Sequence, residues 1–320
     1  MSGDGPQEEP TVTSAPGEST TTVIIAFSTN LAIAGAKTIV ALITGSASML
    51  AESAHSWADT GNEVLLFIAD HRSRRKADSS HPLGYGREAY VWSMFAALGL
   101  FAAGAAVSVW NGVTRLTESS EDVSYFWAYV VLAIAFVLEG ISFRQAFGQA
   151  RGEAHRLERD VLEHALATSD PTLRAVFAED AAALVGLVIA AAGILLHQLT
   201  GNAVYDAAGS ILVGLLLGVV AVILINRNRR FLTGQESDSR TRDAALRRLK
   251  EMPEITRVAY LRLEFVGPRQ VVLVASVDLT GDQPETRVAY ILRDLERRVE
   301  ENPNVIEAVL TLATPDEPSI

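Results

Sequence analysis

The chain has 320 residues, of which 49% are hydrophobic and 20% are charged, and its mean hydropathy is +0.21. It contains no cysteine, which excludes disulfides, thiolate metal ligands and thiol redox chemistry. The formal net charge of −11 argues against a nucleic-acid partner, because such a protein would be expected to carry a basic patch. The composition indicates a membrane protein of moderate size, in which any bound metal must be held by oxygen atoms and imidazole.

The first 21 residues are predicted to form a disordered tail. Up to position 20 the segment is rich in Gly, Pro, Ser and Thr and has four acidic residues but no Lys or Arg, a composition that buries too little apolar surface to fold. It lacks the basic region of a secretory signal, so the apolar segment after it is expected to be retained as a first span. The absence of a targeting segment favours a bacterial inner membrane.

Six apolar segments follow, each close to the ~20 residues that cross ~30 Å of hydrocarbon. They comprise residues 22–43, 47–69, 89–114, 124–147, 173–195 and 204–225. Basic residues gather after the second, fourth and sixth segments, where the chain has Arg72, Arg74, Arg75, Lys76, Arg87, then Arg151, Arg156, Arg159, Arg174, then Arg227, Arg229 and Arg230. By the positive-inside rule these three loops and both termini are cytoplasmic. Residues 22–230 are therefore predicted to form a domain of six transmembrane helices.

Residues 231–320 have the pattern of a cytoplasmic α+β domain. Helices are predicted near residues 239–252 and 285–301, and strands near 258–265, 270–279 and 305–312. The first two strands are joined at Gly267-Pro268, which suits a tight turn. The resulting α-β-β-α-β order indicates a small domain with an open-faced sheet, and we expect it to serve in dimerisation.

Four side chains able to bind a cation lie within the second apolar segment. Glu52, His55, Asp59 and Glu63 follow a 3-4-4 spacing, which places them on one face of a helix. Ionisable groups at bilayer depth cost several kcal/mol unless they face a bundle interior or a wet cavity, so this stripe predicts a functional site. A path for a cation is the natural interpretation.

Two longer motifs make the chain resemble the cation diffusion facilitator family of metal-ion/proton antiporters over about residues 22–315. The first runs from Ser46 to Glu52 as Ser-Ala-Ser-Met-Leu-Ala-Glu and continues as His55-Ser-x-x-Asp59-Thr. The second is His81-Pro-x-Gly-Tyr-Gly-Arg-x-x-Tyr-x-Trp92. The resemblance implies a six-span homodimer with a cytoplasmic ferredoxin-like domain, which exports Zn²⁺ or a similar divalent cation in exchange for H⁺.

The resemblance also implies a metal site between the second and fifth spans. His55 and Asp59 match the second-span ligand pair and Asp180 matches one fifth-span ligand, whereas Val176 stands where the other ligand is usual. This version resembles a subgroup, including mitochondrial zinc transporters, in which adjacent acids such as Glu179 and Asp180 lie on the fifth span. Helix rise alone places Asp59 ~18 Å and Asp180 ~20 Å below the outer surface, so the two carboxylates reach one level.

The fourth ligand stays open among Glu179, a water molecule and Asn30 of the first span. Glu52 and Glu63 are further candidates, although Glu63 could simply be solvated near the segment end. Adjacent residues point about 100° apart, so Glu179 and Asp180 can both bind one ion only on a distorted helix. Three other intramembrane charges, Lys37, Glu139 and Arg144, are interpreted as snorkelling or interhelical groups outside the site.

A second metal site is suggested by Asp78 and His81 in the loop after the second span, through the same family resemblance. Tyr85 occupies the position where the family's later His would lie, so the site would be incomplete. The glycines at 84 and 86 are expected to form a tight turn, with Arg87 as a membrane-surface anchor.

Mixed nitrogen and oxygen ligands favour Zn²⁺, with Mn²⁺, Fe²⁺ or Co²⁺ as alternatives. The bound ion is cargo, and no cofactor is expected. The partners expected are divalent cations, protons, the lipid bilayer and a second copy of the chain. A non-transporting metal sensor or scaffold would share every motif and stays an alternative. An enzyme is not expected, because an intramembrane metalloprotease would need a His-Glu-x-x-His pair, which the sequence lacks.

Overall fold

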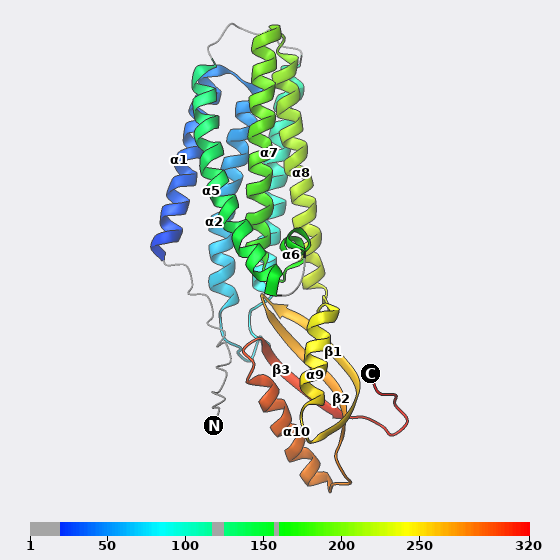
Figure 1. The fold of residues 1–320 in the computed structure, drawn as a ribbon. Helices are drawn as coiled ribbons and strands as arrows, with labels where there is room; N and C mark the ends of the chain where they lie inside the picture. The colour runs from blue at the N-terminus through cyan, green and yellow to red at the C-terminus, as the bar shows by residue number, and fades with distance from the viewer. Residues whose placement is uncertain (1–19, 117–124, 157–159) are drawn as a thin grey trace, which may run out of the picture.

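The protein is described by a computed structural model, which covers residues 20–116, 125–156 and 160–320. It has a long helical bundle and, at one end of the bundle, a smaller domain of strands and helices (Figure 1). The bundle consists of α1 Thr20–Thr44, α2 Ala47–Ser73, α3 Glu88–Ala96, η1 Ala97–Phe101, α4 Ala102–Arg115, α5 Phe126–Arg156, α6 Val161–Ala167, α7 Pro171–Thr200 and α8 Val204–Leu232. The tail predicted to be disordered lies, up to residue 19, outside the described residues.

Within the described residues, five helical segments are long and apolar enough to span a membrane. They are Phe27–Thr44, Glu88–Arg115, Phe126–His155, Pro171–Thr200 and Val204–Leu232. The second of these combines α3, the π-helical turn η1 and α4 into the predicted third span. The remaining predicted span is α2, which has 27 residues but carries many polar side chains. The structure thus supports a helical membrane domain of five or six apolar helices.

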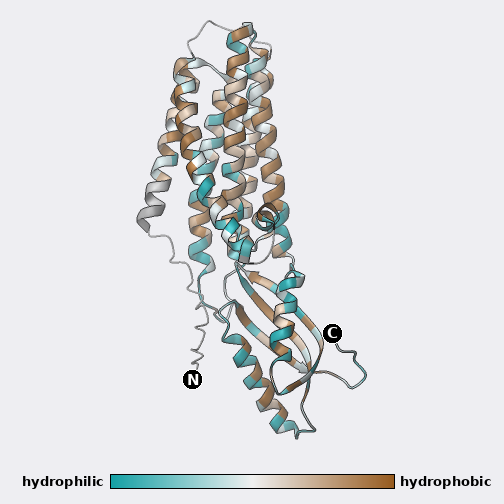
Figure 2. Ribbon diagram, viewed as in Figure 1, coloured by the Kyte–Doolittle hydropathy of each residue, from teal (hydrophilic) through white to brown (hydrophobic). Residues whose placement is uncertain are grey.

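Helix α2 occupies the centre of the bundle, in contact with α1, α3, α4, α7 and α8. Its polar face is therefore covered by protein, which is the condition under which charged groups are tolerated at membrane depth. Figure 2 shows that the helices of the bundle consist largely of hydrophobic residues, whereas the helices of the terminal domain are much more hydrophilic. Helix α5 packs against α1 and α7, and the short helix α6, which the sequence pattern did not predict, packs against α5 and α7.

The C-terminal domain has the predicted α-β-β-α-β order. It comprises α9 Ser239–Lys250, β1 Ile255–Gly267, β2 Gln270–Leu279, α10 Glu285–Glu300 and β3 Val305–Leu312. The sheet order is β1-β2-β3, with β1 and β2 antiparallel and β2 and β3 parallel. Apolar side chains from all three strands and from both helices form one core, which includes Leu249, Val258 and Leu295. The domain therefore has its own hydrophobic core, separate from the bundle.

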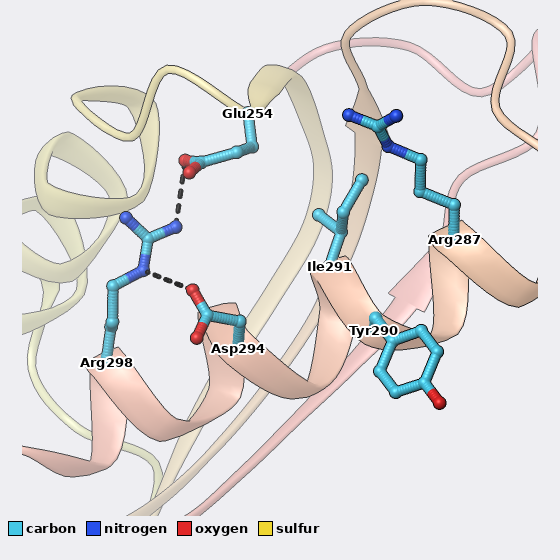
Figure 3. A pocket seen from close by; sticks show the side chains of 6 residues that line it. All are labelled: Glu254, Arg287, Tyr290, Ile291, Asp294 and Arg298. Carbon is cyan, nitrogen blue, oxygen red and sulfur yellow. Dashed lines mark ion pairs between the residues drawn. The ribbon is translucent and has the colours of Figure 1, made fainter.

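Ion pairs on the surface of α10 fix this helix to the segment before β1. Arg298 lies 2.8 Å from Glu254 and 3.4 Å from Asp294 of its own helix (Figure 3). Tyr290, in the same shallow hollow, is 75% exposed and points outward in the figure. The hollow is shaped by partly exposed charged side chains that pair with each other, which indicates a structural role.

The predicted turn at residues 267–268 is confirmed, and it docks against the bundle. Gly86, in the loop between α2 and α3, lies so close to it that a Cβ at this position would be 2.6 Å from the Val266 carbonyl oxygen. Arg87 pairs with Glu264 of β1 at 2.8 Å. Gly84 has a φ of +76°, which confirms the tight turn. The motif loop thus also binds the terminal domain, a contact that its sequence did not indicate.

Candidate metal site

The first turn of α2 is fixed to α8 by a buried carboxylate. Asp206 accepts hydrogen bonds from the backbone nitrogens of Ala47, at 2.6 Å, and Ser48, at 3.1 Å, and from the Ser46 hydroxyl at 2.8 Å. A carboxylate at a helix N-terminus satisfies N–H groups that lack an intrahelical partner and complements the positive end of the dipole. The contact fixes the axial position of α2 and hence the height of the side chains along it.

The four residues Glu52, His55, Asp59 and Glu63, here called the α2 stripe, lie on the interior face of the bundle. Glu52 and His55 are 0% and 1% exposed, and the Asp59 side chain is 16% exposed. The His55 Nε2 atom lies 3.5 Å from Asp59 Oδ1. Among the described residues, neither imidazole nitrogen of His55 has a hydrogen-bond partner, and Asp59 Oδ1 has none either. Buried polar atoms normally have partners, so these atoms are suited to binding an ion.

The adjacent acids of α7 point to different helices. Both carboxylate oxygens of Glu179 accept hydrogen bonds from the Asn62 amide of α2, at 2.6 and 2.7 Å. Asp180 Oδ2 accepts from the Ser142 hydroxyl of α5 at 2.7 Å. The divergence follows from the ~100° rotation between neighbouring helical residues. Both acids are more than 90% buried, and both interact electrostatically with Asp59.

These residues are near one another but do not close around a single point. In the described part of the chain, no group of three or more His, Asp and Glu side chains is arranged to hold a metal ion. The structure therefore brings Asp59, Glu179 and Asp180 into electrostatic range, with His55 beside Asp59, and leaves their joint ligation of one ion a prediction.

The other candidate ligands each have a protein partner. The Asn30 amide donates to Glu63 Oε1 at 2.5 Å, so these two candidates bind each other across α1 and α2. Lys37 of α1 lies 3.0 Å from Glu52 Oε2. Of the three charges placed outside the site, Lys37 is thus an interhelical charge, 1% exposed, and Arg144 is exposed.

Glu139 of α5 is half-buried and interacts electrostatically with Lys37, Glu52 and Asp59. Glu139 was predicted to lie outside the site, whereas the structure places it among the charged residues around the α2 stripe. The available signal was its position within the apolar stretch Phe126–His155, where a lone acid is costly unless it faces other polar groups. Asn62 and Ser142 were missed because amides and hydroxyls in a span carry no comparable signal.

Val176, which occupies the usual position of a second fifth-span ligand, is packed against apolar side chains. It packs against a hydrophobic cluster that includes Ala58 of α2 and Leu224 of α8. The α7 backbone therefore directs this position toward a hydrophobic contact.

The loop residues proposed for a second metal site form a hydrogen-bonded turn. Asp78 Oδ1 accepts from the Ser80 hydroxyl at 2.6 Å and from the His81 backbone nitrogen at 2.9 Å, and Oδ2 accepts from the Tyr85 hydroxyl at 2.7 Å. The hydrogen bond from Ser80, followed by that from Tyr85, holds the pKa of Asp78 well below its usual range. The His81 ring stacks on Tyr85, with centroids 4.0 Å apart. These contacts favour a structural role for the loop carboxylate.

A helical membrane domain whose central helix carries buried acidic and imidazole side chains has the architecture of an ion transporter. Comparison with known proteins agrees. The chain matches the cation efflux transmembrane domain over residues 23–233. It is an integral membrane protein that belongs to the cation efflux, or cation diffusion facilitator, family, which is a family of transporters and not of enzymes.

Three relatives illustrate the similarity. The chain is 37% identical over 233 residues to metal tolerance protein C4 from Arabidopsis thaliana, an alignment that covers 73% of this chain and 51% of that protein. It is 34% identical over 238 residues to the mitochondrial proton-coupled zinc antiporter SLC30A9 from Xenopus laevis, covering 74% and 43%. For the same antiporter from Homo sapiens the identity is 32% over 260 residues, covering 81% and 46%. The chain spans about half the length of these relatives.

Proposed function

We propose that the chain exports divalent cations, with zinc as the main substrate, from the cytoplasm in exchange for protons. The observation that carries the proposal is the α2 stripe facing the acids of α7, with Asp59 in electrostatic range of Glu179 and Asp180. The named activity of the zinc antiporters supports the choice of ion and of counter-ion. Because the chain spans only part of those proteins, the activity stays a proposal for this chain.

His55, Asp59, Asp180 and Glu179 are the proposed ligands. His55 and Asp59 lie one turn apart on α2, and their facing atoms, 3.5 Å apart, lack hydrogen-bond partners among the described residues, so a cation could bind between them. Asp180 and Glu179 would have to release Ser142 and Asn62, at least in part, to reach the same ion. Mixed nitrogen and oxygen ligation favours Zn²⁺ over Cu⁺, with Mn²⁺, Fe²⁺ or Co²⁺ as secondary cargo.

Exchange with protons follows from the chemistry of these ligands. A divalent metal requires deprotonated carboxylates and a neutral imidazole, so metal binding displaces protons and protonation displaces metal. A site open alternately to the two sides of the membrane then couples export of the cation to entry of protons. We expect the His55 imidazole, like the carboxylates, to take up a proton only when the metal leaves.

The orientation and assembly are proposed from the sequence. The arginine-rich loops place both termini and the C-terminal domain in the cytoplasm. We assign the chain to a bacterial inner membrane, to the subgroup with adjacent acids at 179 and 180, and to a homodimer. The strand order and the two helices on the sheet support a ferredoxin-like C-terminal domain.

Zinc uptake into proteoliposomes containing the purified chain tests the function. We expect Asp59→Asn and Asp180→Asn each to reduce the initial rate by about a hundredfold or more, since even outer-shell changes cost 10–100-fold at metal sites. Asp70→Asn, at the exposed end of the same helix α2, is the matched control and should leave the rate unchanged. Wild-type protein that binds zinc without transporting it would instead identify a metal sensor or scaffold.

A further inference from the structure

Lys37 of α1 carries an amino group that is buried inside the membrane domain. It is 1% exposed, and its Nζ atom donates hydrogen bonds to Glu52 Oε2 at 3.0 Å and to the Ser56 hydroxyl at 2.8 Å. Glu52 belongs to the α2 stripe and is fully buried. A buried ion pair is weak evidence for stability, because desolvation of the two charges offsets their attraction. The pair therefore calls for a functional reason.

The second oxygen of Glu52 faces the same small space as the imidazole of His55. A Cβ added to Gly186 of α7 would lie 2.6 Å from Glu52 Oε1 and 3.6 Å from His55 Nδ1. Neither of these two atoms has a hydrogen-bond partner among the described residues. A carboxylate oxygen and an imidazole nitrogen that converge in this way are a ligand pair suited to a divalent cation. In the part of the chain that the structure describes, the ammonium group of Lys37 forms the ion pair with Glu52 at this end of the stripe.

We propose that Lys37 is a specificity-determining residue that confines the divalent cation to the Asp59 end of the α2 stripe. Its positive charge neutralises Glu52 and repels a dication from the Glu52–His55 pair, so that this pair does not become a second, tighter position. The inference rests on the proposed function, because it concerns the cation bound at His55 and Asp59. It adds that Glu52, although one helical turn from His55, is not a ligand in the wild-type protein.

The physical reason lies in the charges of this region. Glu139 of α5 interacts electrostatically with both Lys37 and Glu52, so two carboxylates, Glu52 and Glu139, share the influence of one ammonium group. Without Lys37 those two acids and His55 would offer a dication a dehydrated and strongly negative position. A cation held there would dissociate slowly, and a transporter needs its cargo to leave. The ammonium group of Lys37, which is part of the chain, occupies the space beside Glu52 and leaves Asp59 accessible to the cation.

Zinc binding to the purified full-length protein, measured by isothermal titration calorimetry, tests the inference. We expect Lys37→Gln to tighten zinc binding by about tenfold or more, or to add a second bound zinc ion, because the repelling charge is removed. Zinc release from proteoliposomes should slow accordingly. Lys37→Arg keeps the charge and should behave like the wild type. A merely structural role predicts the opposite sign for Lys37→Gln, since an unpaired buried Glu52 would loosen the site.

If the single variant does not fold, the double variant Lys37→Gln/Glu52→Gln still allows the zinc affinity to be compared with that of the wild type. It removes both charges of the pair, leaves no unpaired buried ion, and should restore the wild-type zinc affinity within about threefold. A loss of about tenfold or more in the double variant would show that Glu52 is itself a ligand and would overturn the inference. Unchanged affinity and stoichiometry in folded Lys37→Gln would overturn it too.

The outcome is separable from that of the proposed function. Wild-type protein that binds zinc but does not transport it would overturn the proposed function and leave the binding comparison intact. Wild-type protein that binds no zinc would overturn both.

Discussion

Replacement of Asp206 should destabilise the membrane domain by an amount that follows from its contacts. Asp206→Ala leaves two backbone N–H groups and the Ser46 hydroxyl of the α2 N-terminus without their acceptor in a buried site. An unsatisfied buried donor costs about 1–3 kcal/mol, so three of them cost about 3 kcal/mol even at the lower end. At roughly 2–4 °C per kcal/mol for a domain of this size, the melting temperature should fall by roughly 6–12 °C.

Thermal unfolding in detergent, followed by circular dichroism, measures this change. Asp206→Asn keeps one side-chain acceptor oxygen and should lose about half as much. Asp70→Ala, an exposed acid at the opposite end of α2, is the control and should shift the midpoint by no more than about 1 °C. A midpoint of Asp206→Ala equal to that of the control would refute the reasoning that this carboxylate fixes α2 to α8.

Three further predictions concern other parts of the chain. Gly186→Ala should cost about 1–3 kcal/mol of stability in thermal unfolding, because its Cβ would lie 2.6 Å from Glu52 Oε1 and the buried Glu52 carboxylate is held by Lys37 at 3.0 Å. Gly140→Ala, whose nearest contact is at 4.0 Å, should not destabilise the protein. The hydrogen bonds to Asp78 lower its pKa, so they stabilise the loop fully above about pH 4, the pKa of the unfolded chain, and this stabilisation is lost as the pH falls through the folded pKa. Hydrogen exchange of the loop amides should therefore differ between the wild type and Asp78→Asn near neutral pH, and this difference should shrink in acid. Residues 235–320 expressed alone should fold and self-associate, and a circular dichroism spectrum of a disordered chain would contradict the separate core.

The sequence predicted those features that depend on local pattern. The apolar segments and the alternation of residues in β1 and β2 gave the helices of the bundle and the α-β-β-α-β order, because length and period are properties of contiguous residues. The glycine and proline of residues 267–268 marked the turn that the structure contains. The short helix α6 was not predicted, because seven residues hold too few turns for a periodic signal.

The candidate site was predictable only as far as it lies on one helix. The spacing of Glu52, His55 and Asp59 places them on one face whatever surrounds them. The partners of these residues come from other helices, and helix packing is not encoded in the period of a single segment. Lys37 is the clearest case, since a lone lysine in an apolar span looks the same whether it reaches the headgroups or, as here, Glu52.

Arg269 links the position of the C-terminal domain to the angle between helices α5 and α7 of the bundle. It lies 2.6 Å from Glu153 of α5 and 3.6 Å from Asp170, which caps α7, and its backbone nitrogen donates to Ser169 Oγ at 3.1 Å. These two helices also carry Ser142 and Asp180, which are joined by a hydrogen bond farther along the bundle. Any tilt of α5 relative to α7 must therefore either break one of the contacts of Arg269 or carry the β1–β2 turn with it. Arg269 thus couples the small domain to α7, which carries two of the proposed ligands, and to the neighbouring helix α5.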